Sequence, residues 1–71
     1  MELVDFPLEG EYIDLLQLLK ATGIAQTGGH AKMIVEDELV IRNGELETRK
    51  RAKLRKGDKI SVDGQVEISL V

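Results

Sequence analysis

Two dipeptides, Asn43-Gly44 and Asp63-Gly64, constrain the fold of this chain more than any other feature of its sequence. Each lies between short strand-like runs, and the runs around Asp63-Gly64 alternate between apolar and polar residues. Asn-Gly also suits the type I′ turn, because that turn requires a positive φ at both central residues. The sequence therefore predicts two β-hairpins, one over residues 39–47 and one over residues 59–70.

The first half of the chain has a helical periodicity instead. Residues 12–22 carry apolar side chains at three- and four-residue spacing, and Gly23 follows as a C-terminal stop. A second helix is predicted from an N-cap at Thr27 to about Asp37. The core-facing residues of the first helix are predicted to be Tyr12, Leu15, Leu16 and Leu19, with Ile13 and Leu18 widening the buried face. Those of the second are predicted to be Ala31, Ile34 and Val35.

A short strand is predicted at Leu3-Val4, ahead of the helices, because Pro7 soon interrupts the chain. The predicted order is thus a short first strand, two packed helices and a small antiparallel β-sheet, which is an α+β fold. Seventy-one residues correspond to one small domain, so we expect a single domain over residues 1–71. The absence of cysteine excludes disulfides and Cys-ligated zinc as supports for the small core.

Charge is distributed unevenly along the chain. The formal net charge is −3, yet residues 42–59 carry eight bases against three acids. Residues 1–41 carry two bases against eight acids. Because local potential rather than net charge steers association, an anionic partner remains compatible with this sequence.

The densest basic segment spans residues 49–59. Successive side chains of an extended chain point to opposite sides, so Ala52 and Leu54 can pack inward while cations line the outer side. These outer cations are Arg49, Arg51, Lys53 and Arg55. Two interpretations remain open: a surface for an anionic partner, or a solvated sheet edge kept basic to prevent edge-to-edge pairing.

The start of the second predicted helix is a candidate phosphate site. Thr27, Gly28 and Gly29 would present free backbone N–H groups at the positive end of the helix dipole, with His30 and Lys32 in the same turns. The alternative is an ordinary capped helix whose His and Lys side chains are solvated. The phosphate interpretation requires this site to share a face with the basic segment.

No pattern in the chain indicates catalysis. There is no G-x-S-x-G elbow, no P-loop and no calcium-loop spacing, so we expect neither an enzyme nor a cofactor or metal site. The longest apolar runs are two or three residues, and the N-terminus lacks a signal-peptide pattern. We therefore expect no membrane span and a cytoplasmic location.

The two aromatic residues, Phe6 and Tyr12, both fit the predicted core. Modules that bind single strands stack bases on exposed aromatic rings, so this mode of binding is disfavoured here. No predicted helix carries the basic and amide residues of a DNA major-groove reader. If the partner is a nucleic acid, the sequence favours structured RNA, recognised through its phosphates and shape.

A leucine-rich helix ending at Gly23 is followed by Ile24-Ala25-Gln26-Thr27, Ala31-Lys32-x-Ile34 and Val40-x-x-Asn43-Gly44. In this order and spacing, the chain resembles the alpha-L RNA-binding domain, the module named after ribosomal protein S four. Glu47-Thr48-Arg49 and Thr27-Gly28-Gly29 are most similar to the small stand-alone bacterial proteins of the YbcJ type. The resemblance implies a non-catalytic module of two helices and a β-sheet that binds structured RNA.

The resemblance also implies that RNA binds the start of the second helix and the adjoining strands. Together with the basic segment, this gives the predicted RNA-binding residues Thr27, Gly28, Gly29, His30, Lys32, Arg42, Asn43, Arg49, Lys50, Arg51, Lys53 and Arg55. Family members often carry arginine at the positions of Asp14 and Gly28, and valine at that of Arg42. We therefore expect the cationic contacts to shift to residues 49–56.

The leading hypothesis is a cytoplasmic, non-catalytic protein that recognises structured RNA, either ribosomal or transfer RNA, and associates with the ribosome. No small-molecule substrate is expected. The alternative is a protein-interaction module that docks an acidic partner, such as a ribosome-associated protein, through the basic stripe. The sequence identifies neither the RNA, nor the process served, nor the oligomeric state, nor the role of the acidic first half.

Overall fold

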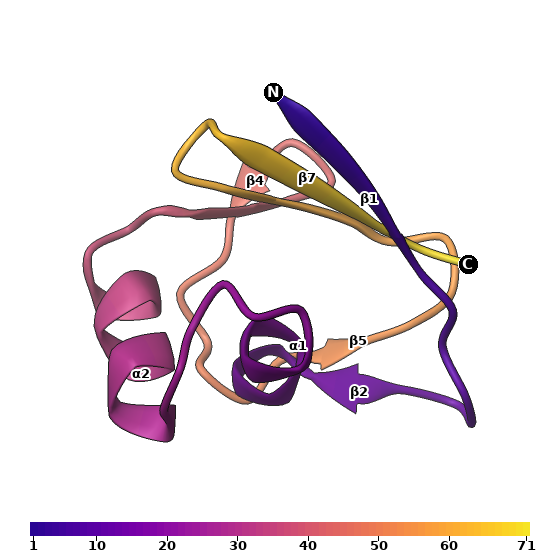
Figure 1. Cartoon of the computed structure of the whole chain (residues 1–71), viewed down its shortest axis with the longest axis horizontal. Helices are drawn as coiled ribbons and strands as arrows, with labels where there is room; N and C mark the ends of the chain where they lie inside the picture. The colour runs from indigo at the N-terminus through magenta and orange to yellow at the C-terminus, as the bar shows by residue number, and fades with distance from the viewer.

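A computed structural model describes all of residues 1–71 and has two helices on one side of a β-sheet (Figure 1). The strands are β1 (Glu2–Phe6), β2 (Ile13–Asp14), β3 (Val40–Arg42), β4 (Glu45–Leu46), β5 (Lys53–Leu54), β6 (Lys59–Val62) and β7 (Val66–Leu70). The helices are α1 (Leu15–Ala21) and α2 (Gly28–Glu36). The predicted α+β fold is confirmed.

Both predicted hairpins are present. β3 pairs with β4 and β6 pairs with β7, each antiparallel, and the main sheet has the strand order β1-β7-β6-β3-β4. The φ angles are 51° and 85° at Asn43 and Gly44, and 55° and 65° at Asp63 and Gly64. Each turn thus has the two positive φ values that a type I′ turn requires.

The first strand extends the sheet beyond its predicted antiparallel part. β1 lies at the sheet edge and runs parallel to β7, with Glu2 opposite Val66 and Phe6 opposite Leu70 (Figure 1). The backbone N–H of Val71 donates to the carbonyl of Phe6 at 3.0 Å and continues this pairing. The first and last strands of the chain are therefore neighbours in a mixed sheet.

The core fills the space between the helices and the inner face of the sheet. Fourteen buried hydrophobic residues form one cluster, to which β6 and β7 contribute alternate residues. The helices contribute Leu15, Leu18, Leu19, Ala31, Ile34 and Val35, as the helical spacing predicts. Neither helix combines the length and the apolarity needed to cross a lipid bilayer.

Helix α1 begins at Leu15, later than predicted. Asp14 remains extended, and its Oδ1 accepts a hydrogen bond from the backbone N–H of Gln17 at 2.8 Å, so Asp14 is the N-cap of α1. Residues 13 and 14 form β2 and pair with Leu54 and Lys53 of β5. The aspartate at a position where the resembling family often has arginine is thus a helix cap.

The prediction that Tyr12 packs in the core is wrong. Because residues 13 and 14 are extended rather than helical, Tyr12 does not continue the buried face of α1. Its side chain is 47% exposed, and the Lys53 Nζ lies 4.9 Å from the centroid of its ring. Phe6, the other aromatic residue, is half-buried and packs against the core.

Candidate nucleic-acid interface

The basic segment is fixed to the start of α1 through its backbone. Leu15 donates its backbone N–H to the carbonyl of Ala52 at 3.0 Å, and β5 pairs with β2. Ala52 and Leu54 are 3% and 0% exposed, which confirms their predicted inward orientation. The segment forms a regular strand at Lys53–Leu54 and again at Lys59, where β6 begins, so turns and side-chain contacts hold the rest.

The outer side of this segment lines a hollow on the surface. Its lining consists of Ala52 and five cations, which are Arg42, Arg49, Arg51, Lys53 and Arg55. We refer to the surface formed by these five cations as the basic hollow. A second depression over the β3–β4 hairpin adjoins it, because Arg42 and Arg49 line both. Cations from two separate segments of the chain are thus gathered on one surface.

Glu47 lies beneath the basic hollow, with only 6% of the residue exposed. Its Oε2 accepts hydrogen bonds from the backbone N–H and the Nε of Arg49, both at 3.1 Å. Its Oε1 accepts from the Nη2 of Arg49 at 3.1 Å and from the Nη1 of Arg42 at 3.4 Å. The side-chain hydrogen bonds of Arg49 lower the pKa of Glu47 to about 2 despite the opposing effect of burial. Glu47 therefore stays ionised and holds two of the five cations in place.

Asp58 binds Arg42 from another direction. Its Oδ2 accepts from the Nη2 of Arg42 and from the backbone N–H of Arg55, both at 2.9 Å, and its Oδ1 accepts from the Nδ2 of Asn43 at 3.0 Å. Burial raises the pKa of Asp58, but the hydrogen bonds from Arg55, Asn43 and Arg42 outweigh it and keep this pKa below its usual value. The turn after β5 is thereby fixed to the β3–β4 hairpin.

Arg42 and Asn43, two of the predicted RNA-binding residues, have their polar groups engaged within the protein. Besides its bonds to the two acids, the Nη2 of Arg42 donates to the carbonyl of Lys53 at 3.0 Å. Asn43 accepts the backbone N–H of Lys59 at 2.9 Å through its Oδ1. These side chains position the basic hollow, whereas the side chains of Arg51 and Arg55 have no hydrogen bond or ion pair within the protein and are exposed.

Lys50 does not line the basic hollow. Its Nζ lies 2.7 Å from the Oε2 of Glu36 at the C-terminal end of α2, and this hydrogen bond lowers the pKa of the Glu36 carboxyl. The pair links the basic segment to α2. It also places a cation beside an acid at the negative end of the helix dipole, where an acid alone would be unfavourable.

The start of α2 is a capped helix end, as predicted. The Oγ1 of Thr27 accepts the backbone N–H of His30 at 3.0 Å, and Gly28 and Gly29 form the first turn. The ion pair that links α2 to the basic segment lies at the other end of this helix, roughly 12 Å away at 1.5 Å per residue. No hydrogen bond or ion pair joins the first turn of α2 to the basic hollow.

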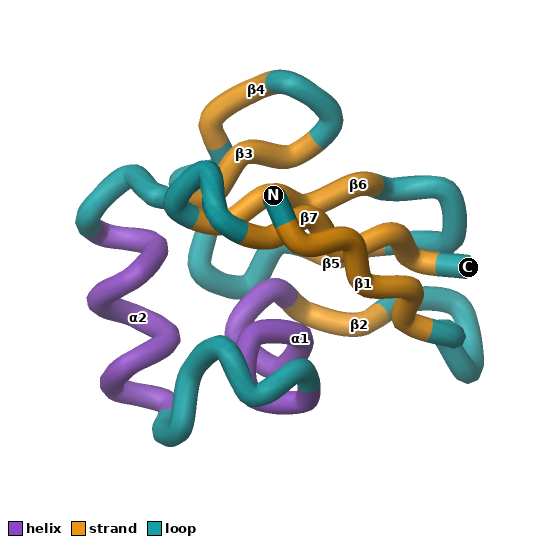
Figure 2. Tube along the Cα trace, turned by 45° about the horizontal axis from the view of Figure 1, so that its top comes forward, coloured by secondary structure: helices purple, strands orange, loops and turns teal.

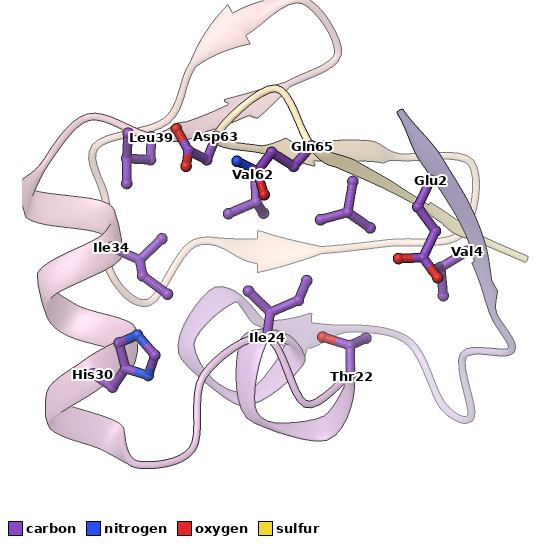
Figure 3. Close-up of a pocket in the computed structure, with 11 residues that line it drawn as sticks. Glu2, Val4, Thr22, Ile24, His30, Ile34, Leu39, Val62, Asp63 and Gln65 are labelled. Carbon is purple, nitrogen blue, oxygen red and sulfur yellow. The ribbon is translucent and has the colours of Figure 1, made fainter.

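His30 is directed away from the basic hollow. Its Nδ1 accepts the backbone N–H of Gln26 at 3.3 Å, and its ring lines a depression between α2 and the sheet with Ile24, Ile34 and Val62 (Figure 3). This depression has a volume of about 470 Å³. The structure thus brings Arg42, Arg49, Arg51, Lys53 and Arg55 together, with Asn43 alongside, but it places His30 elsewhere.

Glu47 and Asp58 were not among the residues predicted for the site. Their signal in the sequence is faint: Asp58 is a single acid among bases, and Glu47 comes just before the densest basic run, two residues after Glu45. In the sequence, such an acid only reduces the local positive charge. The fold shows that it binds arginine side chains. The sequence has no acid between Arg49 and Lys56, but in the fold Glu47 and Asp58 lie against cations of this surface.

The fold and this surface define a small α+β domain that gathers five cations on one surface, two of them held by a buried glutamate. The chain belongs to the S4 domain family, because the sequence model of that family matches residues 6–69. This finding confirms the family resemblance predicted from the sequence.

Two relatives resemble the chain over most of its length. It is 35% identical over 57 residues to the protein of Bacillus subtilis (strain 168) named "Probable ribosome maturation protein RlbA". That match covers 80% of this chain and 80% of the relative. It is 36% identical over 53 residues to the protein of Escherichia coli (strain K12) named "Putative RNA-binding protein YbcJ". That match covers 75% of this chain and 76% of the relative.

Proposed function

We propose that this protein is a non-catalytic, cytoplasmic RNA-binding protein that contacts the phosphates of structured RNA through the basic hollow. The observation that carries the proposal is the gathering of five cations from two segments on one surface, two of them held by a buried glutamate. Membership in the S4 domain family supports it, as do the names of the two relatives, one referring to RNA binding and the other to ribosome maturation.

Ribosomal RNA is the proposed partner, with transfer RNA as the second structured RNA to test. Arg51, Lys53 and Arg55 are the cations free to approach a phosphate, and Arg49 adds a further exposed guanidinium, 71% exposed, despite its bonds to Glu47. The fixed arginines lose less side-chain entropy on binding than free ones would, because the protein has already ordered them.

The experiment measures the affinity of the purified protein for ribosomal RNA and for transfer RNA over a range of salt concentrations. If three to five phosphates are neutralised, log K falls against log salt with a slope of roughly −2 to −4.5. The variant Arg51→Gln/Arg55→Gln removes two cations of the hollow and is expected to reduce the steepness by roughly 1.5.

The matched control is Lys20→Gln/Lys59→Gln, which removes the same charge from two exposed lysines that do not line the hollow. A salt slope near zero, or equal effects of the two double variants, would contradict the proposal. Partners captured from a cell extract that survive nuclease treatment, in the absence of RNA binding, would support the alternative of an acidic protein docked on the same surface.

A further inference from the structure

Tyr12 lies at the edge of the basic hollow, although it is distant from most of that hollow in the sequence. Asp14 is opposite Lys53 in the pairing of β2 with β5, which run side by side (Figure 2). Side chains alternate along an extended strand, so Tyr12 lies on the same face as Asp14 and is a diagonal neighbour of Lys53. The Lys53 Nζ is 4.9 Å from the centroid of the Tyr12 ring.

The exposure of this ring has no explanation within the fold. Tyr12 is 47% exposed, does not belong to the hydrophobic core, and its hydroxyl makes no hydrogen bond within the protein. Its one notable contact is with a lysine that itself lines the basic hollow. An exposed aromatic face beside a cationic surface has the two components with which proteins hold unpaired nucleotides, a stacking platform and a phosphate contact.

We propose that Tyr12 is the stacking platform for one unpaired nucleobase of the RNA whose phosphates occupy the basic hollow. This inference rests on the proposed function. The flexible stem of Lys53 lets its ammonium move from the ring to the phosphate of that nucleotide while the base takes its place on the ring. The RNA that fits is a duplex with an unpaired nucleotide at its end or in a bulge.

Acids beside Tyr12 limit the unpaired segment to about one nucleotide. Glu9 and Asp14 line, together with Tyr12, a depression that none of the arginines lines. A phosphodiester chain that continued across this depression would meet like charges, which raise its free energy. A neutral base can approach the ring from the hollow, but a long single strand cannot extend past it.

The experiment compares two RNAs, a blunt-ended hairpin and the same hairpin with one unpaired adenosine at its 3′ end. We expect the protein to bind the second RNA about 5- to 30-fold more tightly, from the contribution of one base stacked on an aromatic ring. Tyr12 is the only tyrosine and the chain has no tryptophan, so intrinsic fluorescence reports on this residue alone. Its emission is expected to be quenched by the RNA with the unpaired adenosine and not by the blunt hairpin.

Three variants separate stacking from other effects. Tyr12→Leu keeps apolar bulk without a π face and is expected to abolish the preference while leaving the binding of the blunt hairpin within about 2-fold. Tyr12→Phe keeps the ring and is expected to keep the preference. Leu3→Ala, which shortens another exposed apolar side chain, is the matched control and is expected to change nothing. Thermal melting of each variant verifies that it is folded.

The two proposals fail in different ways. Equal, salt-dependent binding of both hairpins by the unmodified protein would overturn the stacking proposal and leave the proposed function standing. A preference that persists in Tyr12→Leu would also overturn it. Absence of binding to either hairpin, and to ribosomal and transfer RNA, at low salt would overturn both.

Discussion

The two regions predicted to hold phosphate, the basic hollow and the start of α2, differ in how their polar groups are held. In the hollow, Glu47 and Asp58 bind Arg42 and Arg49 in fixed positions. At the start of α2, Thr27 holds only the cap, and Lys32 is exposed without a hydrogen bond or ion pair of its own. Cations crowded densely enough to attract a polyanion also repel one another. The comparison teaches that acids held against these cations, Glu47 buried and Asp58 half-buried, make such crowding compatible with a stable fold.

Loss of the acid beneath the hollow is expected to have the largest effect. Glu47→Gln leaves Arg49 without its anion and leaves Arg42 with Asp58 alone. It should reduce the free energy of unfolding by about 3 kcal/mol, the low end of the range for breaking a buried pair, because Arg49 is largely exposed and Arg42 keeps its bond to Asp58. For a domain of this size the melting temperature would fall by roughly 10 °C or more. Chemical denaturation provides the measurement.

The control for this variant is Glu45→Gln, the same chemical change at an exposed position of β4. Its effect should lie within about 0.5 kcal/mol of zero. Equal losses of stability in the two variants would show that Glu47 contributes only general charge balance and would remove the distinction between the two regions.

The stability of the protein should also depend on pH through the ionisation of Glu47. Because folding lowers the pKa of Glu47 from 4.5 to about 2, its contribution is fully present above the unfolded pKa and is lost as the pH falls through the folded pKa. As the pH falls from roughly 5 to 2, protonation of Glu47 should therefore reduce the free energy of unfolding by up to about 3 kcal/mol. The lowered pKa of Asp58 acts in the same direction.

Unfolding curves of the unmodified protein and of Glu47→Gln across this pH range provide the measurement. The difference in stability between the two should shrink steadily with acid. A constant difference at all pH values would mean that the Glu47 carboxyl does not titrate in the folded protein as this network requires.

Two substitutions of Asn43 compare how much its positive φ and its side-chain hydrogen bonds each contribute to stability. Asn43→Ala loses the bonds to Asp58 and Lys59 and also places alanine at a φ of 51°, so we expect a loss of about 2 kcal/mol. Asn43→Gly loses the same bonds but tolerates this φ, so we expect a loss of about 1 kcal/mol. Thermal or chemical unfolding distinguishes the two. The reverse order would mean that glycine's unfolded-state entropy outweighs turn strain here.

The smallest effect is expected at α2. Lys32→Gln should weaken RNA binding by less than about 3-fold at 0.1 M salt, since this lysine does not line the hollow and would reach at most one phosphate. Electrophoretic or fluorescence titration compares it with Arg51→Gln/Arg55→Gln. If Lys32→Gln were as damaging as that double variant, the interface would have to include α2, and the contrast between the two regions would disappear.

Local chemistry explains why much of the fold could be predicted from the sequence. The Asn-Gly and Asp-Gly turns need positive φ at adjacent residues, and the Thr27 cap acts within three residues, so each is encoded by its immediate neighbours. The inward orientation of Ala52 and Leu54 follows from the period of an extended chain. The order of the elements followed from these patterns, and the family resemblance implied the same two helices and sheet.

The features that were missed depend on distant partners. Residues 12–14 have a spacing that continues the apolar face of α1. Ile13 and Asp14 pair with β5 instead of forming helix, and Tyr12 is therefore exposed. Likewise, Arg42 donates a hydrogen bond to Asp58, which lies sixteen residues later, and no local sequence pattern predicts that contact. The charges of the candidate site could be predicted as a group, but not which of them are engaged within the protein.

The parallel pairing of β1 with β7 has a mechanical consequence. Because the two strands run side by side in the same direction, the chain ends lie at opposite ends of the pair (Figure 1). A force that pulls on the two ends therefore loads the hydrogen bonds between the strands in shear, all at once, rather than peeling them apart one by one. This small domain should accordingly resist stretching along its ends far better than opening along the β3–β4 hairpin, whose strands would separate bond by bond.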